Sequence, residues 1–542
     1  MKIIIIGAGP GGYETALVAA KRGAEVVLIE AGHVGGTCLN EGCIPTKAFC
    51  KNAQVLDGLR EAEAFGVTGL SYDFDFGAVT ARKNAVVEQL RGGVEGLLGH
   101  KNITLVRGKA SFKDAHTVVV TSTAVPTELP TAVPTEHPTA VPTELPTAVP
   151  TEHPTAVPTE HPTAVPTELP TAVPTELPTA VPTELPTVIS SETEGRVEKS
   201  EYTADYIIIA TGSVSASLPI PGADLPGILT SREILDIQEV PKRLCVIGGG
   251  VIGLEFASIF RSFGSEVTVL EYFKEILPRF DSDLSKRLKQ SLSKKGIEIC
   301  TQAQVTGIEA QDEAFRVSFT RKGKEETLEA DQVLMAVGRK ANVASLNLAD
   351  IGIEFSPRGI VVDDKTMQTN IPHIYAVGDI NGKMMLAHAA TFQGLVALDH
   401  IMGVQNEIDL SVMPAAVFTS PEAACVGMTE EDCKAAGIPV KCLKSFFRAN
   451  GKAVTMGETD GFCKVIVAAE PKTEGQADGT TQPGPAVEPG RILGCHLYGP
   501  HASDIVQEAC ALITRKATLA EFQSIIHTHP TLTEVLQTAV HD

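Results

Sequence analysis

The sequence predicts an α/β protein built from several domains. Strand-like and helix-like segments alternate along most of its 542 residues. A glycine-rich turn joins a strand to a helix at two places, which indicates two separate βαβ units, whereas the final third has no such start. A chain of this length can form three or four domains with sizeable cores. We therefore expect two α/β domains followed by a separate α+β domain.

Composition and charge narrow the class of protein. The formal net charge is −21 and Lys and Arg form no cluster, which argues against nucleic acid or anionic lipid as a partner. No apolar stretch approaches the roughly 20 residues of a membrane span, and no leader peptide precedes the first strand, so we expect a soluble, cytoplasmic protein. The 11 cysteines are odd in number and scattered, unlike a secreted disulfide framework. Any disulfide is therefore expected to be catalytic.

Two low-complexity segments interrupt the chain. The unit TAVPTELP or TAVPTEHP runs eight times over residues 123–186. Proline at every fourth residue excludes helix and sheet, so we expect an extended polyproline-II-like or disordered tract. Strand-like runs that begin at Thr117 and Tyr206 flank it, which indicates an insertion in a surface loop. Residues 470–489, rich in Gly, Pro, Thr and Gln, are predicted to be a second insertion at the tip of a hairpin.

The first glycine-rich turn has the pattern of a dinucleotide-binding site. A strand over residues 2–6 leads into Gly7, Gly9 and Gly12, and a helix follows. These glycines allow a tight turn, close approach of the backbone to a pyrophosphate, and close packing of helix on strand. The helix N-terminus offers unpaired N–H groups to the phosphates. Glu30, at the end of the next strand, is placed to accept hydrogen bonds from a ribose diol.

The same pattern recurs in the middle of the chain. Gly248, Gly250 and Gly253 follow a strand and open a helix, and Glu271 ends the next strand. Two complete copies argue against glycine-rich turns without a ligand and imply two dinucleotides in two Rossmann-like domains. Glu271 would repel a 2′-phosphate and no arginine follows it, which favours NAD over NADP. The alternative is a solvated acid at the end of a strand.

Two closely spaced cysteines follow the first βαβ unit. Cys38 and Cys43 belong to the segment GGTCLNEGCIPTK, residues 35–47. Residues five apart in an ideal helix have Cα atoms roughly 8–9 Å from each other, whereas a disulfide needs about 4.4–6.8 Å. A bridge therefore needs a distorted turn, which Gly42 and Pro45 would allow, and it should be easy to reduce. The alternatives are two unrelated thiols or a metal site, for which no further ligands lie nearby in the sequence.

This segment resembles the active-site segment of the pyridine nucleotide–disulfide oxidoreductases, which include dihydrolipoamide dehydrogenases, glutathione reductases and mercuric reductases. The resemblance implies FAD at the first dinucleotide site and NAD at the second. It implies that Cys43 lies against the flavin as the charge-transfer thiolate, whereas Cys38 is the interchange thiol that attacks substrate. It also pairs Lys47 with Glu255, close to the reactive nitrogen of the flavin. From the residues alone, Lys47 is equally well a surface lysine.

The resemblance assigns further residues to the cofactors. A predicted strand ends at Asp379, at the edge where ligands bind in open α/β sheets. In the family this aspartate holds the ribityl chain of FAD. Ala387 belongs to a segment expected to run along the flavin, and Ala110 is expected near the adenine of FAD. Gly338 is expected at the NAD site.

A histidine and a glutamate near the C-terminus are the candidate base and its partner. Oxidation of a dithiol needs a group that removes a thiol proton, and imidazole suits this near neutral pH. The form His-Pro-Thr-Leu-x-Glu, which resembles dihydrolipoamide dehydrogenases, assigns the base to His529 and its partner to Glu534, not to His527. On its own, a histidine before proline is more often structural. In the family this pair reaches the disulfide of the other subunit, so a homodimer is implied.

Outside the two insertions the resemblance covers nearly the whole chain. It implies four parts: FAD-binding residues 1–215, NAD-binding residues 216–340, a second FAD-binding or central part over 341–411, and a dimerisation domain over 412–542. Residues 237–283 are especially similar to dihydrolipoamide dehydrogenases. Glutathione reductases usually use NADP, and mercuric reductases carry a C-terminal cysteine pair that this sequence lacks.

The activity implied is oxidation of protein-bound dihydrolipoamide through the Cys38–Cys43 disulfide and FAD, with reduction of NAD⁺ to NADH. The implied partner is a lipoyl domain, carried by the acyltransferase of a 2-oxo-acid dehydrogenase or by a glycine-cleavage carrier protein. Two alternatives stay open. One is another flavin-dependent disulfide reductase or an NADH oxidase-like enzyme, which its electron acceptor would distinguish. The other is a binding protein whose repeat is the working part, which deletion of residues 123–186 would distinguish.

Overall fold

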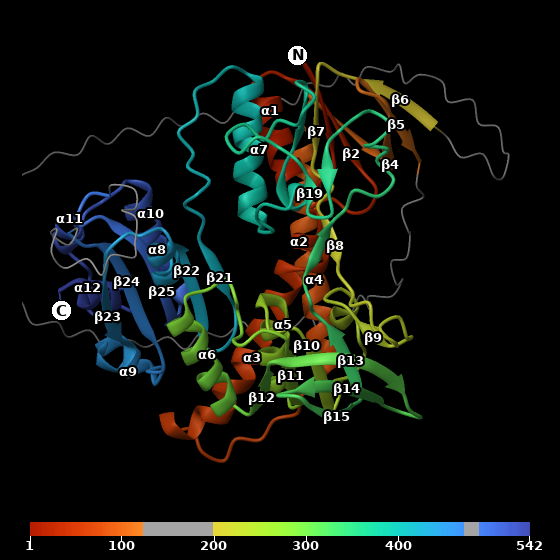
Figure 1. The fold of residues 1–542 in the computed structure, drawn as a ribbon. Helices are drawn as coiled ribbons and strands as arrows, with labels where there is room; N and C mark the ends of the chain where they lie inside the picture. Colours follow the sequence, from red (N-terminus) through yellow and green to blue (C-terminus); the bar gives the residue numbers. More distant parts are fainter. Residues whose placement is uncertain (123–198, 471–486, 542) are drawn as a thin grey trace, which may run out of the picture. The chain divides into compact units, whose positions relative to one another are not determined.

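Figure 1 shows the computed structural model of the chain, which describes residues 1–122, 199–470 and 487–541. The prediction of an extended repeat over residues 123–186 lies outside the described residues, as does most of the second predicted insertion. The described residues belong to one unit by their contacts. Within it the structure contains two parallel sheets and one large antiparallel sheet, which confirms the predicted α/β class.

The first parallel sheet has the strand order β20-β7-β1-β2-β3 (Figure 1). The predicted strand β1 pairs with β2 and β7, and its four isoleucines are buried, as expected for a strand covered on both faces. Strand β20 comes from a segment that follows the second parallel sheet in sequence, so this sheet is discontinuous along the chain. The five strands are β1 Lys2–Ile6, β2 Glu25–Glu30, β3 Ile103–Arg107, β7 Tyr206–Ile209 and β20 Ile374–Ala376.

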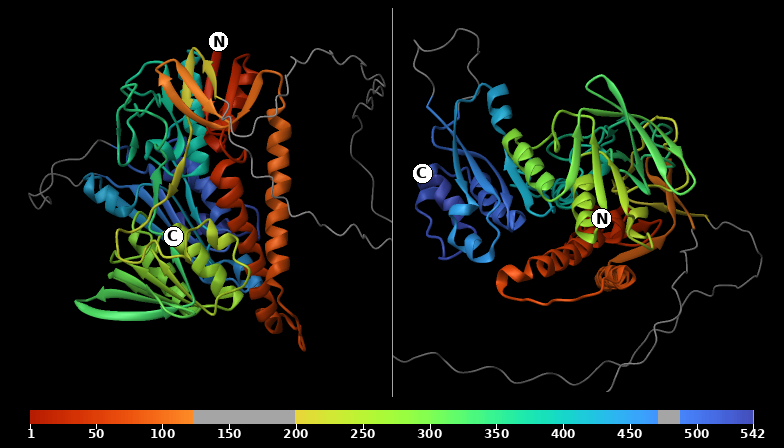
Figure 2. Two further views of the ribbon diagram at one scale, coloured as in Figure 1. Left: turned by 90° about the vertical axis from the view of Figure 1, so that its right-hand side faces the viewer. Right: turned by 90° about the horizontal axis from the view of Figure 1, so that it is seen from below.

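Helices α1 (Pro10–Lys21) and α7 (Ala387–Ile401) lie side by side next to this sheet. Their close approach depends on Gly394, because a Cβ atom there would lie 1.9 Å from Thr15 Oγ1. Two long helices, α3 (Cys43–Glu61) and α4 (Phe76–Leu98), also run side by side (Figure 2).

A small antiparallel sheet, β4-β5-β6, accompanies the first parallel sheet. Its strands are β4 Lys109–Asp114, β5 Thr117–Thr121 and β6 Lys199–Thr203. The sequence predicts β5 and β7 on either side of the repeat but misses β6, whose burial pattern is almost wholly exposed and carries no hydrophobic alternation. The repeat therefore joins two neighbouring antiparallel strands, consistent with an insertion in a loop.

The second parallel sheet has the order β12-β11-β10-β16-β9. Its central helix α5 starts directly after the second glycine turn, and α6 follows β11. A three-stranded antiparallel sheet, β13-β14-β15, follows β12 in sequence. The elements are β9 Ile228–Leu229, β10 Arg243–Ile247, α5 Val251–Phe263, β11 Glu266–Glu271, α6 Ser282–Lys294, β12 Ile297–Thr301, β13 Ala303–Ala310, β14 Phe315–Arg321, β15 Lys324–Ala330 and β16 Gln332–Met335.

The C-terminal part forms a five-stranded antiparallel sheet with the order β21-β22-β25-β24-β23. Strands β24 and β25 pair across the predicted second insertion, so the hairpin is where the sequence predicts it. The elements are β21 Ala415–Val417, β22 Glu422–Gly427, α8 Glu430–Ala435, β23 Val440–Phe446, α9 Gly451–Met456, β24 Phe462–Ala468, β25 Ile492–Gly499, α10 Ala502–Thr514, α11 Leu519–Gln523 and α12 Glu534–His541.

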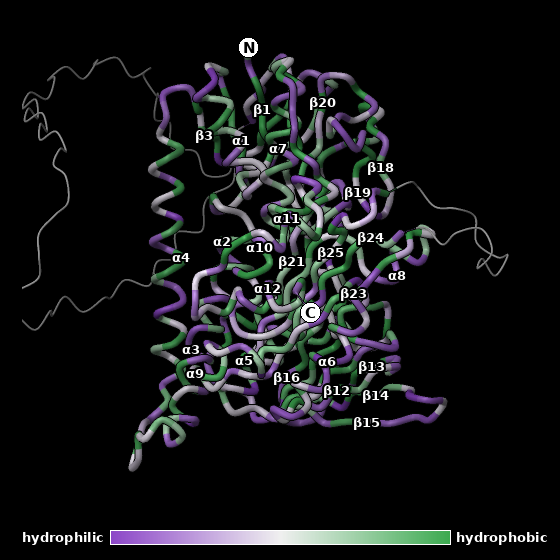
Figure 3. The backbone as a smooth tube through the Cα atoms, turned by 90° about the vertical axis from the view of Figure 1, so that its left-hand side faces the viewer, coloured by the Kyte–Doolittle hydropathy of each residue, from purple (hydrophilic) through white to green (hydrophobic). Residues whose placement is uncertain are grey.

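Short elements complete the described chain. They are α2 Gly36–Glu41, β8 Ser213–Ser215, β17 Arg339–Ala341, β18 Phe355–Ser356, β19 Gly359–Ile360 and the 3₁₀ turns Ala62–Phe65, Glu233–Leu235, Gly378–Asn381 and Phe447–Ala449. Hydrophobic residues concentrate in strands such as β1, whereas α4 alternates hydrophobic and hydrophilic residues along its length (Figure 3). No helix in the described ranges is long and apolar enough to cross a membrane. The first parallel sheet takes β20 from the predicted part 341–411 and its other strands from 1–215. The division of the chain into four parts stays a prediction.

Candidate active site

The first glycine turn is shaped to leave one face of the backbone open. A Cβ atom on Gly7 would lie 2.4 Å from the carbonyl oxygen of Ala210, and one on Gly12 would lie 1.8 Å from that of Gly7. Gly7 also has a φ of +103°, which side chains rarely adopt. At Gly9 the nearest atom is a Cα atom 3.9 Å away. The outer glycines thus serve the packing of the turn, and the middle one leaves room for a phosphate to approach the start of α1.

The second glycine turn repeats this arrangement. A Cβ atom on Gly248 would lie 2.4 Å from the carbonyl oxygen of Ala336, and one on Gly253 would lie 2.0 Å from that of Gly248. At Gly250 no described atom lies within 4 Å. Both turns therefore fit the close approach of a dinucleotide pyrophosphate to the N-terminus of a helix.

The acids that end β2 and β11 lie beside their own glycine turns. Glu30 accepts a hydrogen bond from the N–H of Ala8 at 2.7 Å, and Glu271 accepts one from Gly249 at 2.6 Å. Each carboxylate also accepts one from a residue that follows its strand. A carboxylate has about four acceptor positions, so both acids keep capacity for the hydroxyl groups of a ribose.

The candidate redox cysteines lie on either side of a break between two helices. Cys38 belongs to α2 and Cys43 begins α3, and Gly42 between them has φ −144° and ψ −107°, outside the helical range. This break replaces the continuous helix that would hold the two residues apart, and the two thiols are close enough for each to change the pKa of the other. The distorted turn that the sequence requires at Gly42 is thus present, and both cysteines are free thiols here.

The two thiols have different acidities. The hydrogen bond from Cys38, helped by the positive charge of Lys47, lowers the pKa of Cys43 to about 7 although burial acts in the opposite direction. The same hydrogen bond, together with burial, raises the pKa of Cys38. When the pair is reduced, Cys43 is therefore the cysteine that carries the negative charge near neutral pH.

Lys47 and Glu255 form a largely buried ion pair beside these thiols. The Lys47 Nζ atom lies 3.0 and 2.9 Å from the two Glu255 carboxylate oxygens. Burial acts to lower the pKa of Lys47, but the Glu255 carboxylate outweighs it and raises that pKa. The backbone N–H of Phe418 donates to Glu255 at 3.0 Å, and the Phe418 ring lies 4.3 Å from Nζ. Phe418 is a contact of this site that sequence reasoning missed, because its position follows from tertiary packing.

Replacing Lys47 with methionine should raise the pKa of Cys43, since the variant removes a positive charge and leaves Glu255 nearby. The thiolate would then form only at higher pH, by about one pH unit or more. The measurement is the rate at which iodoacetamide alkylates Cys43 in the dithiol-reduced protein, followed against pH by peptide mass spectrometry. Lys51→Met, an exposed lysine one turn along α3, is the matched control. If the pH dependence of alkylation is unchanged in the Lys47 variant, Lys47 does not lower the pKa of Cys43.

Asp379 lies just after β20, at the carboxyl edge of the first parallel sheet as predicted. Its carboxylate accepts a hydrogen bond from Ser213 Oγ, and the guanidinium group of Arg339 lies 3.9 Å away. Burial raises the pKa of Asp379 above its usual value. Arg339 also donates to Ser213 Oγ at 2.7 Å. No sequence pattern predicts Ser213 or Arg339 as partners of this acid.

The other predicted cofactor residues occupy defined places. Ala387 starts α7, Ala110 is buried in β4, and Gly338 precedes β17 with a φ of +121°. The cofactor roles of these three residues stay predictions.

The two C-terminal histidines differ clearly in their surroundings. The His529 side chain is 79% exposed, and its Nδ1 atom lies 2.8 Å from Glu534 Oε1. The N–H of Thr531 donates to Glu534, and this hydrogen bond and that of His529 lower the pKa of the glutamate. His527 is instead buried, with Nε2 2.9 Å from Glu508. His529 is therefore the histidine whose second ring nitrogen is available to another molecule.

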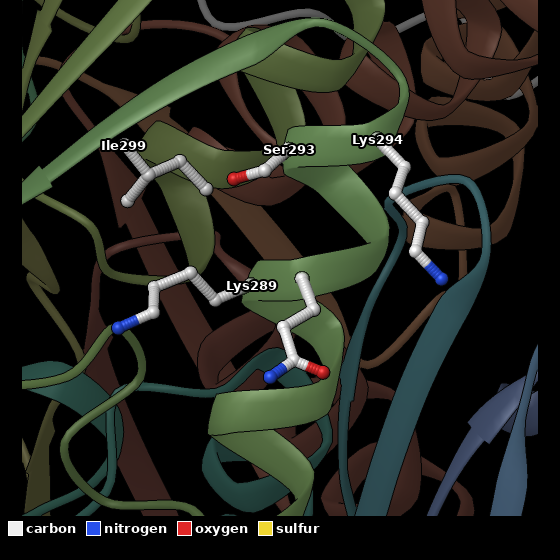
Figure 4. A pocket seen from close by; sticks show the side chains of 5 residues that line it. Lys289, Ser293, Lys294 and Ile299 are labelled. Carbon is white, nitrogen blue, oxygen red and sulfur yellow. The ribbon is translucent and has the colours of Figure 1, made fainter.

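Within the described part of a single chain, no hydrogen bond or ion pair connects His529 or Glu534 to Cys38 or Cys43. A shallow hollow of about 470 Å³ lies elsewhere, along α6 (Figure 4). Its lining includes Lys289, which already pairs with Glu275 at 2.6 Å. None of the predicted site residues lines this hollow, so we assign the chemistry to the cysteine pair and not to the hollow.

Comparison with known proteins identifies the family. Residues 1–128 and 171–394 match the family described as pyridine nucleotide-disulphide oxidoreductase, and residues 413–474 and 486–540 match the dimerisation domain of that family. Residues 153–188 match a PT disordered repeat. The chain belongs to the pyridine nucleotide-disulphide oxidoreductase family, and its dimerisation domain supports a homodimer.

Curated relatives indicate which group within the oxidoreductase family this chain resembles. The dihydrolipoyl dehydrogenase of Chlamydia muridarum is 36% identical over 98% of this chain and 94% of its own length. That of Geobacillus stearothermophilus is 34% identical over 99% of this chain and 94% of its own length. The chain is accordingly an FAD-dependent oxidoreductase similar to dihydrolipoyl dehydrogenases, with FAD and NAD as its cofactors. The predicted family and cofactors are thereby confirmed.

Solved structures agree with the fold. The HOCl-induced flavoprotein disulfide reductase RclA from Escherichia coli is 26% identical with a TM-score of 0.73, and covers 100% of this chain and 99% of its own. LpdA from Mycobacterium tuberculosis is 23% identical with a TM-score of 0.77, and covers 100% of this chain and 99% of its own, which supports the fold.

Proposed function

We propose that this chain oxidises protein-bound dihydrolipoamide to lipoamide and reduces NAD⁺ to NADH. The observation that carries the proposal is the Cys38–Cys43 pair, whose thiols meet across the break at Gly42 beside the Lys47–Glu255 ion pair. The similarity to dihydrolipoyl dehydrogenases along the whole chain supports this substrate over other dithiols.

The reaction begins with Cys38 and Cys43 joined as a disulfide. One thiolate of dihydrolipoamide attacks the sulfur of Cys38, forms a mixed disulfide and releases Cys43 as a thiolate. The second substrate thiolate then attacks the substrate sulfur in that mixed disulfide, which closes the lipoamide ring and releases Cys38. The substrate loses two electrons and two protons, and the protein disulfide gains the two electrons.

His529 acts as the general base and general acid of this thiol–disulfide exchange. Its free ring nitrogen accepts a proton from the substrate thiol and returns it to the departing Cys38. Glu534 holds the other ring nitrogen, which fixes the tautomer and stabilises the charged imidazole. Because the dyad is exposed and lies in the dimerisation domain, we assign it to the cysteine pair of the second subunit of a homodimer.

Lys47 stabilises the thiolate that Cys43 becomes, and Glu255 holds Lys47 in place. The chemistry that FAD supplies is the transfer of an electron pair from the reduced cysteines to NAD⁺ as a hydride. The residues proposed to hold FAD are Gly7, Gly9, Gly12, Glu30, Lys47, Ala110, Asp379 and Ala387. The residues proposed to hold NAD are Gly248, Gly250, Gly253, Glu271 and Gly338.

The proposed protein partner is a lipoyl domain, on the acyltransferase of a 2-oxo-acid dehydrogenase or on a glycine-cleavage carrier protein. The proposed location is the cytoplasm, because 11 scattered cysteines suit a compartment that keeps structural thiols reduced better than a secreted disulfide framework.

The test is reduction of NAD⁺ by dihydrolipoamide with the purified, FAD-loaded protein, followed by NADH absorbance. We expect fast turnover with dihydrolipoamide and none with reduced glutathione as the control thiol. Absence of turnover, in a protein that holds FAD and a reducible disulfide, would contradict this substrate and leave the disulfide chemistry in place.

The similarity to RclA favours a second candidate, a flavin-dependent disulfide reductase. In this candidate, NADH at the second glycine turn would supply the electrons. The direction of electron flow and the acceptor separate the two candidates. NADH-dependent reduction of another disulfide, faster than reduction of lipoamide, would favour the second.

A further inference from the structure

Lys464 is a charged residue in the interior of the C-terminal sheet. It lies in β24, where every residue is buried, and its side chain is 1% exposed. Its Nζ atom lies 2.9 Å from Asp281, 3.3 Å from Asp283 and 2.6 Å from Glu430. The ammonium group has three N–H donors, and three carboxylates surround it.

Asp281 depends on this lysine more than the other two acids do. Asp281 is the N-cap of α6, where its carboxylate accepts a hydrogen bond from the N–H of Asp283. Its side chain is 0% exposed, whereas Asp283 and Glu430 reach solvent. In the described parts of the chain, Lys464 is the cation within ion-pair distance of Asp281. A buried carboxylate needs such a partner, because burial without one is strongly unfavourable.

The ion pair joins the start of α6 to the C-terminal sheet. Helix α6 follows β11 in sequence and packs against β12 of its own sheet and also against β25 of the C-terminal sheet (Figure 2). The Ser291 hydroxyl donates to Asp460 at 2.6 Å, and the guanidinium group of Arg287 lies over the rings of Phe446 and Phe462. Helix α6 therefore contacts the C-terminal part of the chain along its length, and the Asp281–Lys464 ion pair makes this contact at its start.

The segment 272–281 connects this fixed helix start to the second glycine turn. The N–H of Leu277 donates to the carbonyl oxygen of Gly249 at 3.0 Å, and the N–H of Phe280 donates to that of Leu277 at 2.9 Å. Leu277 has a φ of +47°, a conformation that a leucine keeps only where its surroundings hold it. Its side chain is buried. At the other end, Glu271 binds the N–H of Gly249.

We propose that Lys464 is a positioning residue for NAD binding. Its ion pair with Asp281 fixes the end of segment 272–281, and Leu277 in that segment holds Gly249 next to the open backbone at Gly250. Loss of the ion pair frees the segment, lets Leu277 leave its left-handed conformation, and widens the range of conformations of the glycine turn. This inference rests on the proposed role of that turn as the NAD site.

Asp281→Asn tests the proposal with little change of shape. Asparagine is as good an N-cap as aspartate, so α6 keeps its start while the ion pair loses its charge. The measurement is the Kd of NADH for the FAD-loaded protein, by titration calorimetry. We expect the Kd to rise about tenfold. Reduction of the Cys38–Cys43 disulfide by dihydrolipoamide in the absence of NAD⁺ should be unchanged, because the second glycine turn takes no part in it.

Two further variants sharpen the test. Lys464→Met should raise the Kd of NADH more than Asp281→Asn does. If the Lys464→Met protein fails to fold, the Asp281→Asn protein is sufficient for the test. Lys444→Met is the matched control, because Lys444 pairs with Asp283 at the rim of the same cluster, 2.6 Å away. That ion pair is partly exposed and contributes little to the stability of the helix start, so the Kd of NADH should stay as in the parent protein.

The outcomes are separable. An unchanged Kd in a folded Asp281→Asn protein, even with a lower melting temperature, would overturn the positioning role and make the cluster purely structural. Failure of the parent protein itself to bind NADH would overturn the proposed NAD site, and the positioning role with it.

Discussion

Replacement of Cys43 by serine should reduce dihydrolipoamide oxidation by roughly three orders of magnitude or more. The serine hydroxyl cannot form the disulfide that accepts the substrate electrons, and it does not ionise near neutral pH as the Cys43 thiol does. The measurement is NAD⁺ reduction by dihydrolipoamide at saturating concentrations of both. A Cys43→Ser protein that still oxidises the dithiol at the parent rate would refute the proposed cycle.

The control for this prediction is a reaction that bypasses the cysteines. NADH-dependent reduction of an artificial electron acceptor uses the dinucleotide sites alone and should survive in the Cys43→Ser protein. Cys50→Ser is the matched variant, because Cys50 lies on the same helix and its thiol donates only to the backbone oxygen of Phe418 among the contacts described. Burial raises the pKa of Cys50 to about 12, so this thiol is not a nucleophile near neutral pH. Dithiol oxidation should persist in that variant.

Replacement of His529 by glutamine should lower dihydrolipoamide oxidation by about 100- to 10,000-fold, the usual effect of losing a general base. Glutamine keeps a polar side chain of similar reach but cannot take up the thiol proton. The rate of the variant should recover partly at higher pH, because more of the substrate dithiol is already ionised there. The measurement is the rate of disulfide reduction by dihydrolipoamide across a pH series.

Glu534→Gln and His527→Gln separate the two histidines. Loss of Glu534 should have a smaller effect of the same kind as loss of His529, and the two losses combined should be less than additive, because the residues act as one unit. His527 is buried beside Glu508, so its replacement should lower stability and leave the pH dependence of the rate unchanged. A pH profile altered by His527→Gln alone would contradict the assignment of the base to His529.

Local sequence patterns predicted much of the fold because they reflect local physics. The isoleucine run of β1 and the glycines after it specify a strand and a turn whatever surrounds them, and the structure has both where predicted. The hairpin across the second insertion was equally visible. Strand β6 escaped prediction because its residues are exposed and polar, so only pairing with β5 makes it a strand.

The two glycine turns and the close spacing of Cys38 and Cys43 follow from the sequence alone, because each depends on residues close together along the chain. Contacts between distant residues appear only once the chain has folded. They include the hydrogen bond from the Phe418 N–H to Glu255 and the contacts of Ser213 and Arg339 with Asp379. They also include the ion pair of the buried Lys464 with Asp281. A lysine among apolar strand residues signals an unusual position, but its partners depend on which surfaces pack together. Such packing depends on the whole folded chain, so no local hydrophobic periodicity in the sequence predicts it.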